Sequence, residues 1–130
     1  MTALRRYRWL PLATVMILTL AAVAAAQHAQ DEVARLLRVE WELPSQEWTR
    51  PRIVGHVYND SGYRVGSVRL RVETLDAAKQ PIRTQLAWIY VDVPARSRAY
   101  FSLRRPAGDL FRLTVESFVL IAREGVSETP

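Results

Sequence analysis

Five side chains that enzymes use for proton transfer and nucleophilic attack occur within six positions of the stretch 55–62, which reads GHVYNDSG. A histidine near a serine and a carboxylate suits acyl transfer, in which the imidazole activates the hydroxyl. Such groups normally converge from distant parts of a chain. The period of two in a strand instead places His56 and Tyr58 on one face and Val57 and Asn59 on the other. Because Asn, Asp, Ser and Gly also bond to nearby backbone in turns, the stretch predicts a strand end and a turn, with no catalytic residues.

Metal and cofactor chemistry has few possible ligands in this sequence. The chain has no cysteine, which excludes disulfides and thiolate ligands, and its two histidines are His28 and His56. We therefore predict no metal and no cofactor. One alternative stays open: cleavage after Ala25 would leave His28 third from a free amine, an arrangement that binds Cu²⁺ in a square plane. Residues 59–61 also match an N-glycosylation acceptor, which a bacterial envelope protein would leave unused.

Two groups of residues are candidates for contact with a partner. Trp48 lies between two prolines in a polar segment with Arg50 nearby, and we expect it to be exposed and to bind. The second group is basic, with few acidic neighbours: Arg96, Arg98, Arg104 and Arg105. These arginines could bind a polyanion, or they could be solvated charges that protect an edge strand from aggregation.

The first 26 residues have the layout of a secretory signal peptide. Three arginines precede an apolar run from Trp9 to Ala26 that ends in a small-residue cleavage pattern. An uncleaved membrane anchor is the alternative, because the run approaches the lower length limit for spanning a bilayer. Without residues 1–26, which hold three of the 18 basic and none of the 13 acidic residues, the formal net charge falls from +5 to +2. Nucleic-acid binding thereby loses its compositional support, and a periplasmic or extracellular location is predicted.

The rest of the chain alternates apolar and polar residues in short runs between turn residues, which is the pattern of β-strands. The run 68–73 shows it most clearly. We expect a flexible segment at 27–35, one β domain at 36–123 and a disordered tail at 124–130. About seven short strands over about 100 residues predict an antiparallel β-sandwich of immunoglobulin type, with a small barrel as the alternative.

Two segments carry more specific predictions about burial. Residues 84–93 are apolar on both faces, so we expect a central strand that is covered on both sides. In residues 110–123 the alternation predicts that Val119 shares the face of Phe111 and Leu113.

Three landmarks follow one another in a recognisable order. A Gly-x-Val-x-Asn turn at 55–59 precedes a hydrophobic strand at 68–76 that ends in aspartate, and a Pro-Ala turn at 94–95 precedes the aromatic pair 100–101. In this order the chain resembles the FxLYD family, small extracytoplasmic sandwich domains of bacteria and archaea. The resemblance implies a structural or binding module without catalytic residues.

These features predict a non-enzymatic, exported module of the bacterial cell envelope. It would bind a protein partner through a sheet edge or through the Trp48 segment. The alternative is a carbohydrate- or polyanion-binding module that uses Trp48 and the arginines. Nucleic acid is not expected as a partner. Contact with the membrane is expected only if the N-terminal segment stays uncleaved.

Overall fold

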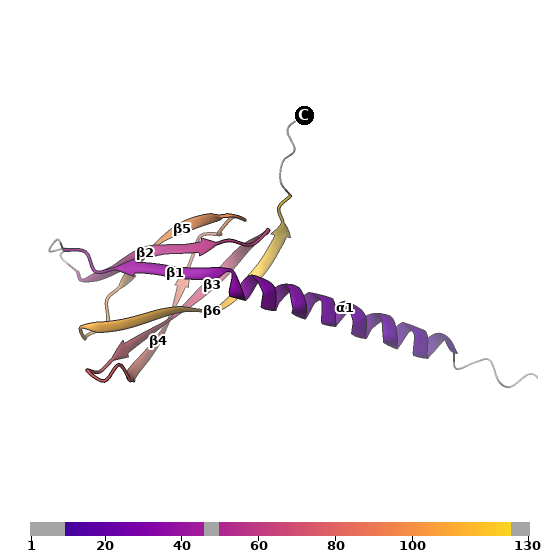
Figure 1. Cartoon of the computed structure of the whole chain (residues 1–130), viewed down its shortest axis with the longest axis horizontal. Helices are drawn as coiled ribbons and strands as arrows, with labels where there is room; N and C mark the ends of the chain where they lie inside the picture. Colours follow the sequence, from indigo (N-terminus) through magenta and orange to yellow (C-terminus); the bar gives the residue numbers. More distant parts are fainter. Residues whose placement is uncertain (1–9, 46–49, 126–130) are drawn as a thin grey trace, which may run out of the picture. The chain divides into compact units, whose positions relative to one another are not determined.

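The computed structural model describes residues 10–45 and 50–125, and the chain divides into two units, 1–32 and 33–130. Its elements are, in chain order (Figure 1), α1 (Leu10–Arg35), β1 (Leu37–Glu42), β2 (Arg52–Asn59), β3 (Tyr63–Leu75), β4 (Pro81–Ile89), β5 (Ser97–Arg104) and β6 (Leu110–Arg123). In the described part of the chain, no helix combines the length and the apolar character needed to cross a membrane.

Helix α1 continues through the segment that we predicted to be flexible. Residues 27–35 form its last turns, and the side chain of Val33 is buried in the core of the second unit. The prediction gave weight to the polar residues of this segment, although Ala, Gln, Glu and Arg are strong helix formers. After Arg35 the amide of Leu36 donates to the carbonyl of Val33 at 2.9 Å, and β1 begins directly at Leu37.

The second unit is a sandwich of two antiparallel sheets, with strand orders β1-β2-β5 and β4-β3-β6. This confirms the predicted all-β class and the sandwich, with six strands among the described residues rather than about seven. The order corresponds to strands A-B-E and C′-C-F of the immunoglobulin fold, and no described residues take the places of strands D and G. Four strands are therefore edges: β1 and β5 in one sheet, and β4 and β6 in the other.

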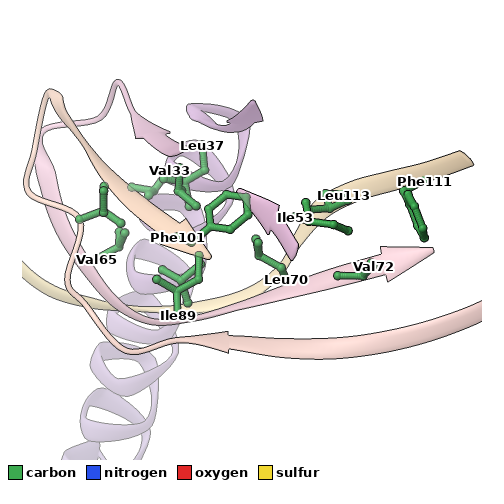
Figure 2. Close-up of a cluster of buried hydrophobic side chains, with 14 residues drawn as sticks. Val33, Leu37, Ile53, Val65, Leu70, Val72, Ile89, Phe101, Phe111 and Leu113 are labelled. Atoms are coloured by element: carbon green, nitrogen blue, oxygen red, sulfur yellow. The ribbon is translucent and has the colours of Figure 1, made fainter. Parts of the chain in front are cut away.

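The core lies between the two sheets and consists mainly of aliphatic and aromatic side chains (Figure 2). Ile53, Val57 and Leu70 are completely buried, and Phe101 and Phe111 are nearly so. Burial alternates strictly along β2, as the period of two predicts. Because the chain has no disulfide, its stability depends on this burial, at about 1.5–3 kcal/mol for each large apolar side chain.

Strand β6 does not keep the same face inward along its whole length. Phe111 and Leu113 are buried as predicted, but Val119 is 55% exposed. The register between β3 and β6 shifts midway along both strands, and beyond this irregularity Phe118 and Leu120 pack against the core. Because a β-bulge inserts one residue, it reverses which positions face inward. The prediction for Val119 was therefore wrong.

Strand β4 is an edge, not the covered central strand that we predicted for residues 84–93. It ends at Ile89 and pairs only with β3. Ile89 is its one buried residue. The chain then leaves the sheet, and Val93 forms an isolated bridge with Val65. The apolar residues on the other face of β4 therefore remain exposed to solvent.

Glu124, which we assigned to a disordered tail, holds the end of β6 in place. Its two carboxylate oxygens accept hydrogen bonds from the Ala95 amide at 2.7 Å and from Arg64 Nε at 2.6 Å. The hydrogen bond from the Ala95 amide lowers the pKa of Glu124 below its ordinary value, and the hydrogen bond from Arg64 lowers this pKa by a smaller amount. Residues 126–130, the rest of the predicted tail, lie outside the described residues.

Replacing Glu124 with glutamine is expected to weaken the acid dependence of stability. A carboxyl group whose pKa is lower in the folded chain stabilises the fold above its unfolded pKa, about 4.3 for Glu. That stabilisation is lost as the pH falls through the folded pKa. Between about pH 5 and pH 3, the melting temperature of the wild type should therefore fall more than that of Glu124→Gln. Equal falls in thermal melts of the two proteins would contradict the assignment.

Candidate functional site

The stretch that resembles a catalytic cluster is a buried hydrogen-bond network around Asn59, which is 0% exposed. The carboxamide nitrogen donates to three carbonyl oxygens, those of Tyr63 (2.6 Å), Val93 (3.2 Å) and Pro94 (3.1 Å). The carboxamide oxygen accepts from the amide and the hydroxyl of Ser61, at 3.0 and 2.6 Å. The network thus ties the end of β2 to the start of β3 and to the connection between β4 and β5.

His56 and Ser61 lie on opposite sides of the sheet β1-β2-β5. The imidazole is on the outer face, with its centroid 6.0 Å from the ring of Tyr58 and 5.6 Å from that of Tyr100. The Ser61 hydroxyl is buried and bonded to Asn59. The two side chains therefore form no nucleophile–base pair.

The outer face of this sheet is polar, and Arg38, Glu40 and Arg98 have partners on it. One row across the three strands consists of Arg38, Tyr58 and Arg98, and the next of Glu40, His56 and Tyr100. The Arg38 guanidinium lies 4.2 Å from the centroid of the Tyr58 ring and also pairs with Glu40. A shallow hollow of about 240 Å³ beside His56 and Tyr100 is lined in part by Glu40 and Glu42. Tyr100, which is 58% exposed, is an aromatic residue on this face and lies opposite His56.

The structure does not bring the four predicted arginines together. Arg98 lies at the start of β5 and Arg96 just before it, whereas Arg104 is its last residue and Arg105 follows it. Arg98 and Arg104 are about 20 Å apart along the strand, at 3.3 Å per residue. Arg105 also forms an ion pair with Asp109 at 3.7 Å. The chain therefore presents two separate basic ends instead of one cluster.

Trp48, the aromatic residue that we predicted to be exposed, lies outside the described residues. Its neighbour Arg50 is described and is exposed. Exposure of Trp48 therefore stays a prediction, and the described structure offers a different exposed tryptophan.

That tryptophan belongs to an apolar patch on β4 and the residues that follow it. The β4 patch consists of Ile82 (68% exposed), Leu86 (49%), Trp88 (46%) and Tyr90 (92%). Trp88 lies opposite Arg69 of β3, and Leu86 lies opposite Arg71. Since directly opposite residues share one face of a sheet, Leu86 and Trp88 point away from the core. Sequence reasoning missed the patch because the two apolar faces of this strand suggested a covered position.

Arg69 holds the indole ring of Trp88 against the sheet. Its guanidinium carbon lies 5.2 Å from the ring centroid, in a cation–π contact. Two other arginines of this face pair with glutamates, both at 2.6 Å: Arg71 with Glu116 and Arg112 with Glu73. Among the described residues Arg69 has no such ion pair, and its buried Nε has no hydrogen-bond partner. The β4 patch thus combines an oriented aromatic ring with a positive charge that lacks a carboxylate.

Elsewhere the described residues offer little for metal or acid–base chemistry. In residues 10–45 and 50–125, no three His, Cys, Asp or Glu side chains gather as metal ligands. A hollow of about 490 Å³ at one end of the sheet β4-β3-β6 includes Asp76, Arg83 and Asp109 in its lining. Asp76 accepts a hydrogen bond from the amide of Gln80 at 2.9 Å, so its carboxylate stabilises the β3–β4 turn.

The Gly-x-Val-x-Asn landmark has a structural explanation at each of its named positions. A side chain at Gly55 would collide with the backbone of β1, Val57 belongs to the core, and Asn59 centres the buried network. The resemblance to the FxLYD family stays a prediction. Comparison of the chain with protein-family models, with curated proteins and with solved structures finds no match.

Proposed function

We propose that the chain is an exported, non-enzymatic binding module of the bacterial cell envelope, and that the β4 patch contacts a protein partner. The observation that carries the proposal is the exposure of Leu86 and Trp88 on the outward face of an edge strand. Export is proposed from the basic and apolar layout of residues 1–26.

Trp88 has the properties of an anchor for a protein interface. Tryptophan is among the residues most enriched at binding hot spots. The contact with Arg69 already orients its ring, so binding would immobilise little additional side-chain freedom. Because Leu86 and Trp88 are each about half exposed, covering the rest would contribute about 1 kcal/mol per side chain.

The charges around the patch indicate the chemistry of the partner. Arg69 is the arginine of this face that lacks a carboxylate among the described residues. A partner that places an Asp or Glu beside it, next to apolar side chains for Leu86 and Trp88, would satisfy both features. We therefore propose an apolar contact with one acidic group at its margin.

The alternative of a polyanion-binding module loses support from the position of its arginines. Arg98 and Arg104 lie near opposite ends of β5, so an extended polyanion would meet two separated charges instead of a continuous basic surface.

Replacing Trp88 with serine is expected to abolish capture of the partner. In pull-downs from envelope extract with the full chain as bait, the amount of the main captured protein, identified by mass spectrometry, should fall at least about tenfold. Tyr100→Ser is the matched control, since Tyr100 is an exposed aromatic residue on the other sheet, and its capture should equal that of the wild type. Equal capture by Trp88→Ser and wild type would contradict the proposal. If Trp88→Ser captures as much as the wild type and soluble glycan abolishes capture by both, carbohydrate binding would be favoured instead.

A further inference from the structure

The free edge of β4 differs from the other three edges of the sandwich. Edge strands normally carry charged side chains or bulges that prevent pairing with another chain. Three edges carry charges on their outward positions: β1 has Arg38, Glu40 and Glu42, β5 has Arg98 and Arg104, and β6 has Arg112 and Glu116 together with its bulge. On β4 the outward positions 84, 86 and 88 carry Thr, Leu and Trp, and the single charged residue of the strand is Arg83.

The part of β4 that can pair regularly is set by the structure. Arg83 to Ile89 lie opposite consecutive residues of β3, whereas Ile82 is the extra residue of an irregularity at Thr74 and Leu75. A regular ladder on the free side is therefore limited to seven residues, 83–89, with Leu86 at its centre.

We propose that β4 pairs antiparallel with β4 of a second copy of this chain, about a two-fold axis through Leu86. An axis perpendicular to the sheet keeps the outward positions of both copies on the same face. Leu86 then lies opposite Leu86 of the second copy, and Thr84 lies opposite Trp88 of the second copy on both sides of the axis. Aromatic and β-branched residues are favourable cross-strand partners.

The same register brings no like charges together. Arg83 lies opposite Ile89 of the second copy, and Gln85 lies opposite Ala87. The register thus pairs Leu86 with Leu86 and Trp88 with Thr84 on the outward face and opposes no like charges. A second copy is favoured as the occupant because the same register gives Leu86 and Trp88 apolar or β-branched neighbours and opposes no like charges.

Pairing of this kind extends the proposed function without replacing it. The two three-stranded sheets would join into one sheet of six strands, with both β4 patches on the same face. The dimer uses the free backbone edge of β4 and the cross-strand contacts of Leu86, Thr84 and Trp88, whereas the proposed partner covers the surface of Leu86 and Trp88 that faces away from the sheet. Dimer formation and partner capture are measured separately, so failure of one proposal is distinguished from failure of the other.

Cysteine crosslinking of the full chain tests the register, because the chain has no cysteine of its own. Leu86→Cys places two thiols opposite each other on the axis, so mild oxidation should give a disulfide-linked dimer. Thr84→Cys is the matched control on the same strand and face. Two residues 84 would be offset by four positions, about 13 Å along the strands, which is beyond the reach of a disulfide. We expect at least about tenfold more linked dimer from Leu86→Cys than from Thr84→Cys.

Light scattering of the uncrosslinked proteins completes the test. At about 100 μM the wild-type chain should scatter as a dimer, with twice the 14.9 kDa mass of one chain. Leu86→Lys would place two ammonium groups opposite each other on the axis, so this variant should be monomeric. Its circular dichroism spectrum should equal that of the wild type, which shows that it is folded. A monomeric wild type, equal crosslinking at positions 84 and 86, or a dimer that persists in Leu86→Lys would each overturn the proposal. If capture of the envelope partner still depends on Trp88 in that case, the proposed function survives.

Discussion

Replacing Asn59 with alanine is expected to lower the melting temperature by about 20 °C. The Asn59 carboxamide is fully buried and makes five hydrogen bonds. Alanine would leave the Pro94 carbonyl and the Ser61 amide without their partner, and the carbonyls of Tyr63 and Val93 would each lose one of two donors. Each unsatisfied buried group costs about 1–3 kcal/mol, and we expect a combined loss of about 4 kcal/mol. That is a large share of the about 5–15 kcal/mol by which a domain is stable.

The control for this effect is His56→Ala in the same strand. His56 is half-buried and contacts the rings of Tyr58 and Tyr100 on the outer face of the sheet, and substitutions on such an outer face change stability by about 0.5 kcal/mol or less. Thermal unfolding followed by circular dichroism compares the two variants. If Asn59→Ala and His56→Ala melt within about 5 °C of each other, the network does not hold the two sheets as the structure indicates.

The buried position of Asn59 also bears on the N-glycosylation motif at 59–61. Its Nδ2, the atom that would carry a glycan, donates to three carbonyl groups inside the fold. A glycan at this atom would break these bonds and has no space in the folded chain. The motif is thus explained by the turn chemistry of Asn and Ser.

Sequence reasoning was accurate where the pattern depends on one strand alone. The alternation of β2 placed His56 and Asn59 on opposite faces, because the period of two is a property of the strand itself. It failed in β6, where the shift of register depends on how β3 pairs with it. Nothing in the alternation of residues 110–123 marks the bulge that exposes Val119.

The candidate site was missed for a related reason. Whether an apolar strand is central or lies at an edge depends on which strands pair with it, and hydrophobicity alone does not specify this. Trp88 was therefore assigned to the core, and Trp48, which lies in a polar segment, was chosen as the exposed residue. The prediction that Arg96, Arg98, Arg104 and Arg105 form one basic cluster was wrong for a different reason. Residues close in sequence lie far apart when the strand between them is extended.

Gly55 explains why β1 can lie so close to β2, and its substitution is expected to have the second large effect. Gly55 lies opposite Trp41 in the register of the two strands. A Cβ atom at Gly55 would lie 2.1 Å from the carbonyl oxygen of Glu40 and 2.7 Å from Trp41 Cα. Because both are backbone atoms, no side-chain rotation relieves the overlap, and β1 itself would have to move away. Trp41 would then lose its edge-to-face contact with Phe111 of the other sheet, at 6.3 Å between ring centroids.

Gly55→Ala is therefore expected to lower the free energy of unfolding by about 3 kcal/mol, the upper range for overpacking in a well-ordered interior. Gly125→Ala is the matched control, because a Cβ there would meet no atom within 4 Å. It should be neutral or slightly stabilising, since alanine restricts the unfolded chain more than glycine does. Urea unfolding of the two variants and the wild type measures both effects. If Gly55→Ala is no more than about 1 kcal/mol less stable than Gly125→Ala, then β1 can shift without loss of packing, and the close approach at Gly55 is not required for the fold.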